Sequence, residues 1–190
     1  CRLMELYYKG LKPVDRYRAT LAEITSGMAY KQATTAEDGE AQKEQAQQDV
    51  YARDFREKDY NWWVAEVKRL NDEAQHTPDK NKATYNKRLL AYLSLVAFMN
   101  ANAALNQQAL PEATRFLNLY KLVDPTNTEW AYLSAVVAMR QQNQSAALAD
   151  MKEAVKLGFA DLDRIRVQAE FQGLQNDPEF NDLLSKINPE

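Results

Sequence analysis

The chain has 190 residues, of which 45% are hydrophobic and 27% are charged, and this composition favours a folded domain with a substantial core over a disordered chain. Its net charge of −3 provides no sequence-wide basic field, so we expect no nucleic acid partner. With 5 glycines and 6 prolines, the sequence favours long helices over a sheet with many turns.

The N-terminal part, residues 1–82, predicts helices and matches no family pattern. A helix is expected from about Pro13, because apolar residues recur there at alternating three- and four-residue steps as Val14, Tyr17, Leu21, Ile24 and Met28. Thr35 is placed to cap the next helix. Residues 40–48 are nearly all Glu, Gln, Lys and Ala, which predicts a helix exposed on most sides.

Asp59 or Asn61 opens a further helix that carries the adjacent residues Trp62 and Trp63. Neighbouring side chains on a helix diverge by about 100°, so both indoles cannot point into one core. We expect one tryptophan in the core and the other against a neighbouring helix. The alternative is an exposed aromatic platform, formed by Trp62 or Trp63, that contacts a ligand.

The polar stretch 76–82 is the expected boundary between an N-terminal helical region (1–82) and a second region (83–190) that continues the same helical domain. A long helix is predicted from Ala83 to Gln107. Its apolar stretch, residues 89–105, is interrupted by polar residues and slightly short for a membrane span, so we predict a buried helix and no transmembrane segment. Ser145 is expected to cap a later helix that Gly158 ends.

The second region repeats itself at a fixed interval. Ala97 corresponds to Ala131 (131 − 97 = 34) and Ala113 corresponds to Ala147 (147 − 113 = 34). The same interval joins four further identical pairs: Ala101 and Ala135, Ala104 and Ala138, Gln107 and Gln141, and Gln108 and Gln142. Thirty-four residues is the length of a helix–turn–helix unit of the tetratricopeptide type.

Over residues 94–187 the sequence therefore resembles bacterial tetratricopeptide repeat proteins. Alanine occupies the positions where the helices of such a unit touch, and residues 147–184 resemble the tail that closes such proteins, with Asp177 and Pro178 opening a capping helix. The resemblance implies an all-α fold of antiparallel helical hairpins in a right-handed superhelix, with extra N-terminal helices and a C-terminal capping helix.

The resemblance also implies binding of a protein or peptide partner on the concave face. Carried over by position, that face comprises Phe98, Asn102, Leu105, Asn106, Tyr132, Val136, Met139 and Arg140. The groove is either open to a partner or filled by the protein's own N-terminal helices, and filling is the favoured alternative.

Residue types needed for catalysis are scarce. His76 is the single histidine and lies in a polar stretch, and the single cysteine is Cys1. The glycines form no phosphate-binding loop. We therefore predict no catalytic residue, no cofactor and no metal site, and we expect the protein not to be an enzyme.

The predicted function is that of a non-catalytic interaction scaffold, an accessory subunit of a bacterial cell-envelope (outer-membrane) assembly. Cys1 is a candidate for lipidation, as in a mature outer-membrane lipoprotein, or it is simply where a fragment starts. The alternative locations are the periplasm or the cytoplasm, as a soluble protein. The alternative function is a glycan- or nutrient-binding surface lipoprotein that uses exposed aromatics, and a hydrolase is a distant third.

Overall fold

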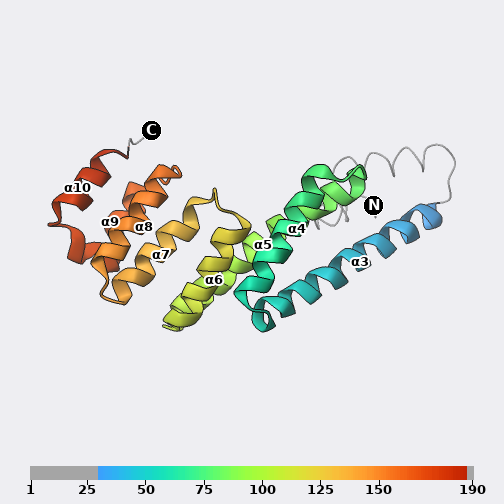
Figure 1. The fold of residues 1–190 in the computed structure, drawn as a ribbon, viewed down its shortest axis with the longest axis horizontal. Helices are drawn as coiled ribbons and strands as arrows, with labels where there is room; N and C mark the ends of the chain where they lie inside the picture. Colours follow the sequence, from blue (N-terminus) through green and yellow to red (C-terminus); the bar gives the residue numbers. More distant parts are fainter. Residues whose placement is uncertain (1–29, 188–190) are drawn as a thin grey trace. The chain divides into compact units, whose positions relative to one another are not determined.

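The computed structural model describes residues 30–187, with side chains from residue 42 onward, and every element in that range is a helix (Figure 1). This confirms the all-α prediction. The elements are α3 (Tyr30–Glu57), α4 (Tyr60–His76), α5 (Lys80–Asn106), α6 (Leu110–Val123), α7 (Thr128–Arg140), α8 (Gln144–Lys156), α9 (Leu162–Val167), the 3-10 helix η1 (Ala169–Leu174) and α10 (Pro178–Ser185). Cys1 and the helix predicted from Pro13 lie outside the described residues.

The chain divides into two compact units, Cys1–Asp54 and Phe55–Glu190. The loop between α4 and α5, where the sequence predicts a boundary near residue 82, joins two helices that pack together inside the second unit. In the first unit, the described residues belong to α3. Thr35, predicted as a helix cap, lies inside α3, and residues 42–49 are mostly exposed, as their polar composition predicts.

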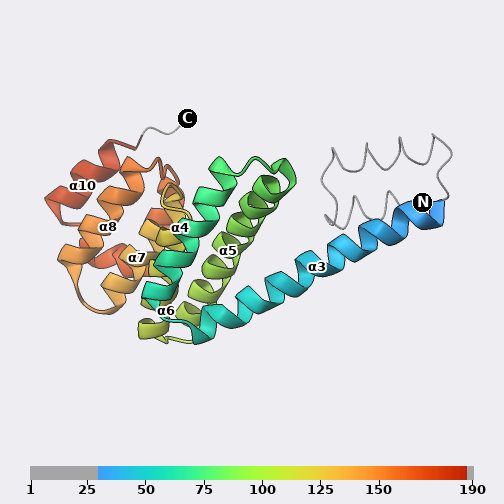
Figure 2. The same cartoon turned by 45° about the vertical axis from the view of Figure 1, so that its right-hand side comes forward.

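In the second unit, each helix from α4 to α7 packs against the next one along the chain (Figures 1 and 2). Polar contacts support two of these packing steps. Asn86 on α5 donates to Glu73 on α4 (3.0 Å), and this hydrogen bond helps to lower the pKa of Glu73. Ser94 on α5 donates to Asp124 at the end of α6 (3.0 Å). Beside Asp124, burial raises the pKa of Tyr120 to about 12.

The α5–α6 and α7–α8 connections are the same turn, thirty-four residues apart. Gln108 and Gln142 both have a positive φ, 58° and 61°. The amide of the residue that follows each of them donates to a carbonyl five residues back, Ala109 to Ala104 and Asn143 to Ala138, both at 2.9 Å. This pairing satisfies helix-end carbonyls and is the Schellman motif. The same bond follows Gly158 at the end of α8, where φ is 103°.

The alanines of the repeat are buried to the same extent in the two hairpins. All six residues of three pairs are fully buried: Ala97 and Ala131, Ala101 and Ala135, Ala113 and Ala147. Alanine removes side-chain bulk where two helix axes approach closely. The interval found in the sequence therefore corresponds to a repeated packing arrangement.

The thirty-four-residue spacing continues beyond α8, in the segment that the sequence predicted to be a closing tail. The N-cap residues Asn127 and Asn143 are followed thirty-four residues later by the N-cap residues Asp161 and Asp177. The predicted cap of α10 is confirmed, because the Asp177 carboxylate accepts from the amides of Glu179 (2.8 Å) and Phe180 (3.1 Å). The helix starts in residues 161–187 thus keep the interval of the repeat, although this segment contains three short helices, α9, η1 and α10, in place of a two-helix hairpin.

The predicted cap of α8 is wrong by two residues. Asn143, and not Ser145, precedes the helix, and its side-chain oxygen accepts from the amide of Ala146 at 3.1 Å. Ser145 lies inside α8 and is exposed. The turn through Gln142 ends early enough for Asn143 to reach the cap position.

Among the described residues, α5 is the one helix long and apolar enough to cross a membrane. Its most apolar 18-residue window has a mean hydropathy of 1.4, and a third of that window is buried. α5 extends beyond residues 89–105, the apolar stretch from which the sequence analysis predicted no transmembrane segment. A core helix of a soluble protein meets the same criterion, so the finding does not by itself indicate a span.

We predict that Gln108→Gly and Gln142→Gly each raise the free energy of unfolding by up to about 1 kcal/mol, because glycine adopts a positive φ without a Cβ clash. Urea denaturation followed by circular dichroism measures the change. Gly158→Ala is the reverse control and should destabilise through backbone strain, since no atom lies within 4 Å of an added Cβ there. A loss of stability in both glycine variants would contradict the assignment of strain to these turns.

Candidate docking surface

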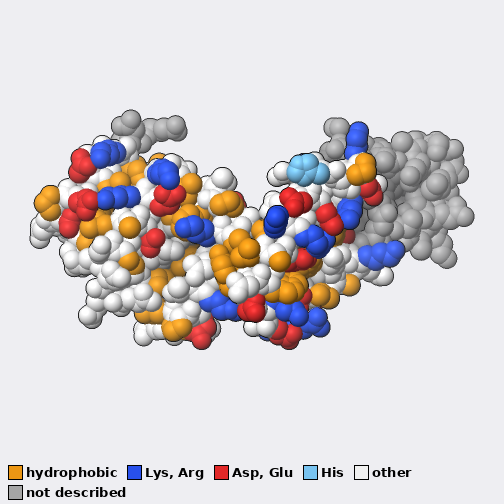
Figure 3. All heavy atoms as spheres, viewed as in Figure 1, with side chains coloured by type: hydrophobic (Ala, Val, Ile, Leu, Met, Phe, Trp, Pro, Cys, Tyr) orange, Lys and Arg blue, Asp and Glu red, His pale blue; other side chains and the backbone are white. Residues whose placement is uncertain are grey.

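On the face of the second unit seen in Figure 3, hydrophobic side chains gather around the middle helices α5, α6 and α7. The surface dips between the end formed by α4 and the end formed by α8 and α10. Two features of this unit are candidates for partner binding, and both involve α5. One is a polar cavity at its C-terminal end, and the other is a row of exposed side chains along its length.

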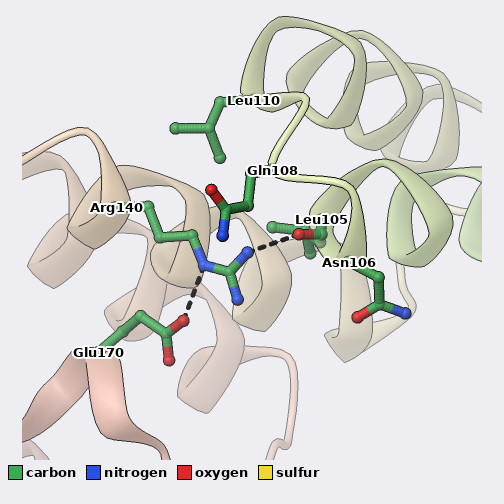
Figure 4. A pocket seen from close by; sticks show the side chains of 6 residues that line it. All are labelled: Leu105, Asn106, Gln108, Leu110, Arg140 and Glu170. Atoms are coloured by element: carbon green, nitrogen blue, oxygen red, sulfur yellow. Dashed lines mark hydrogen bonds and ion pairs between the residues drawn. The ribbon is translucent and has the colours of Figure 1, made fainter.

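The cavity has a volume of about 560 Å³ and lies where the ends of α5 and α7 meet η1 (Figure 4). The side chains that line it are Leu105, Asn106, Gln108, Leu110, Arg140 and Glu170. In Figure 4 the Gln108 side chain reaches toward Arg140, whereas Asn106 points away from it. The turn with positive φ at Gln108 brings the chain back over the end of α5 and so positions this wall.

Arg140 ties three segments together at the cavity. Its Nε donates to Glu170 Oε1 on η1 (2.7 Å), and its Nη1 donates to the carbonyl oxygen of Leu105 (2.6 Å). That carbonyl belongs to the last turn of α5 and also accepts from the Gln108 amide at 3.1 Å, so Arg140 is its second donor. Arg140 therefore caps α5 from the neighbouring hairpin, with its side chain 30% exposed.

The charges in the cavity are matched. Burial raises the pKa of Glu170, but hydrogen bonds from Gln168 and Arg140 outweigh that effect, and the pKa lies below its ordinary value. The carboxylate is thus ionised at neutral pH and paired with the guanidinium. The groups left for a ligand are the side-chain amides of Asn106 and Gln108 and two leucines. This lining suits a polypeptide segment better than a highly charged small molecule.

Of the residues predicted for the concave face, Leu105, Asn106 and Arg140 come together in this cavity. Phe98, Asn102 and Met139 are half-buried. Phe98 packs edge-on against Tyr120, and the Asn102 amide donates to the carbonyl of Phe98 (3.0 Å).

Tyr132 and Val136 are buried, so the prediction that they meet a partner is wrong for this structure. The Tyr132 ring stacks on Phe159 with centroids 4.6 Å apart, and the Arg164 guanidinium lies 4.1 Å from its centre. Its hydroxyl donates to Gln168 (3.0 Å), and burial raises its pKa. Phe159 and Phe171 thus cover the Tyr132 ring, and filling of a concave face by N-terminal helices stays a prediction.

The second feature, which we call the α5 row, was missed by the sequence analysis. It comprises five exposed side chains at four-residue steps: Lys87, Ala91, Leu95, Met99 and Ala103. Leu95 is 54% exposed and Met99 is 59% exposed. The four-residue spacing was visible in the sequence, but apolar residues in a long helix are normally assigned to the core.

One tryptophan of the aromatic pair lies in the core, as the sequence predicted. Trp63 is 0% exposed and packs against the Phe55 ring with centroids 4.4 Å apart. Trp63 is therefore not a ligand platform, which corrects its place among the candidate site residues. Trp62 is half-buried, lies edge-on to Trp63, and has the Lys58 ammonium 5.6 Å from its ring centre.

Residues 42–187 contain no group of three or more His, Cys, Asp or Glu side chains that could hold a metal ion. His76 is the last residue of α4, where a ring nitrogen lies 3.1 Å from the carbonyl oxygen of Asp72.

Comparisons with known proteins gave no match to a family model, a curated protein or a solved structure.

We predict that Arg140→Met lowers the free energy of unfolding by about 1–2 kcal/mol, because it removes one donor from the Leu105 carbonyl and the charged donor from the Glu170 carboxylate. A double-mutant cycle with Glu170→Gln should give a coupling of roughly 0.5–1 kcal/mol. Lys156→Met is the matched control, since Lys156 pairs with Glu153 on the exposed surface of α8. Equal effects of the Arg140 and Lys156 substitutions in urea denaturation would contradict the bridging role.

Proposed function

We propose that the chain is a non-catalytic protein-interaction scaffold of the tetratricopeptide type, with its helical hairpins arranged in a right-handed superhelix. The observation that supports the proposal is the equivalence of the two hairpins in the second unit. The turn geometry and the fully buried alanines both recur at thirty-four residues. Repeats of this length stack to form extended surfaces for a partner rather than enclosed reaction sites.

A partner would meet this scaffold at α5 and at the cavity. α7 is buried on nearly all sides, whereas α5 has an exposed apolar row and ends at a cavity lined by amides and leucines. The one ion pair at the cavity holds two backbone segments in place, which is a structural role. A protein or peptide segment is therefore the proposed ligand.

The proposed setting is a bacterial cell-envelope assembly, in which the chain acts as an accessory subunit. This setting follows from the resemblance to bacterial repeat proteins and is tested by fractionating the cells that produce the chain. Glycan binding by the aromatic pair has less support, because Trp63 is fully buried and Trp62 is half-buried with Lys58 over its ring.

Photocrosslinking tests the proposal. We expect p-benzoylphenylalanine at Asn106, on the cavity wall, to give a discrete protein adduct in the cells that naturally produce the chain. The matched control carries p-benzoylphenylalanine in place of Lys156, which is exposed on α8. Adducts are detected by a shift in mass and identified by mass spectrometry.

No adduct at Asn106 or along α5 above the level seen at Lys156 would contradict the scaffold function. An adduct at the control position alone would place the partner surface elsewhere and would contradict the assignment of this face.

A further inference from the structure

We propose that the α5 row binds an amphipathic helix of a protein partner, with apolar side chains on its contacting face and a carboxylate placed against Lys87. This inference rests on the proposed function and adds the chemical class of the partner.

The α5 row is a continuous ridge. Side chains four residues apart lie one above another on a helix, so Lys87, Ala91, Leu95, Met99 and Ala103 follow one line with a slow drift around the axis. Sixteen residues at 1.5 Å each give it a length of roughly 24 Å. Small alanines on both sides of Leu95 and Met99 leave room for larger side chains from an opposing helix.

The corresponding residues of α7 are covered. Met99 corresponds to Leu133 (133 − 99 = 34), which is buried, and Leu95 corresponds to Glu129, whose carboxylate pairs with Arg164 at 2.6 Å. In α7 the carboxylate of Glu129 is thus paired with an arginine. In α5 the corresponding residue is the exposed Leu95, so a partner would gain binding free energy by burying an apolar side chain against it.

The distribution of charge along α5 indicates where the partner helix would carry its charged group and where it would be apolar. The helix has no Asp or Glu, and no charged residue lies between Leu89 and Pro111. Its basic residues are all in the first nine positions: Lys80, Lys82, Lys87 and Arg88. Lys82 pairs with Glu73 (3.2 Å), whereas Lys87 forms no ion pair with any residue that the structure describes. A partner with a carboxylate at this end and apolar groups beyond it matches that pattern.

Helical geometry is favoured over an extended segment for a physical reason. The backbone groups along the middle of α5 are already paired within the helix, so a strand laid on it would gain no main-chain hydrogen bonds. A helix needs none from its partner. Its ridges can pack beside the α5 row at an interaxial distance of about 8–10 Å.

The test begins with p-benzoylphenylalanine at Leu95 in the full chain, in the cells that produce it, followed by sequencing of the crosslinked partner peptide. A synthetic peptide with that sequence is then bound to the purified full chain. We expect the peptide to become helical on binding, and Leu95→Glu or Met99→Glu to weaken binding about tenfold or more. Val167→Glu is the matched control, because Val167 is 79% exposed on α9, away from the row.

The charge assignment has its own test. Lys87→Glu should weaken binding about threefold to tenfold, and replacing the peptide's carboxylate residue by lysine should restore the affinity for that variant. Circular dichroism of each variant confirms that the fold is retained.

Several results would overturn the inference. These are an adduct at Leu95 with a lipid, with a second copy of the chain or with the same chain, a peptide that binds in extended form, and no rescue by the charge exchange. If Leu95 gives no adduct while Asn106 does, the inference fails and the proposed scaffold function stands. If neither position gives an adduct, the proposed function fails as well.

Discussion

The second unit depends on the close approach of paired helices at positions where the side chain is a single methyl group. Ala113 on α6 and Ala147 on α8 are fully buried in equivalent hairpins, as are Ala97 and Ala131 on the facing helices. A larger side chain at these points would push the helix axes apart. Because each hairpin packs against the next, such a displacement would also move the turns that form the cavity wall.

The two hairpins differ in what surrounds them. α7 lies between α6, α8 and η1, and its aromatic residue Tyr132 is covered by Phe159 and Phe171. α5 is packed by α4 and α6 but keeps Leu95 and Met99 exposed. Arg140 on α7 connects the two hairpins, because its side chain donates both to the last turn of α5 and to Glu170 on η1. A repeated element thus presents a closed face at one hairpin and an open face at the other.

The helical fold and the repeat interval were predictable because they follow from spacing alone. Three features were not. The positive φ of Gln108 and Gln142 has no glycine to signal it, and Asn143 caps a helix at which Ser145 looked equally suitable. The C-terminal segment 161–187 keeps two N-cap positions of the repeat but, of its four alanine positions, only the one at Ala169 (135 + 34), so identity matching misses it. For the site, position in the repeat found Asn106 and Arg140, but burial of Tyr132 and exposure of Leu95 depend on neighbouring segments that spacing does not specify.

The equivalence of the hairpins is tested most directly by adding bulk at the buried alanines and measuring stability by urea denaturation. Ala113→Leu and Ala147→Leu should each lower the free energy of unfolding by about 1–3 kcal/mol. Ala149→Leu, at an exposed position of α8, should change it by less than about 0.5 kcal/mol. If either buried alanine accepts leucine as readily as Ala149 does, the paired helices do not approach closely at that point, and the repeated packing arrangement is wrong.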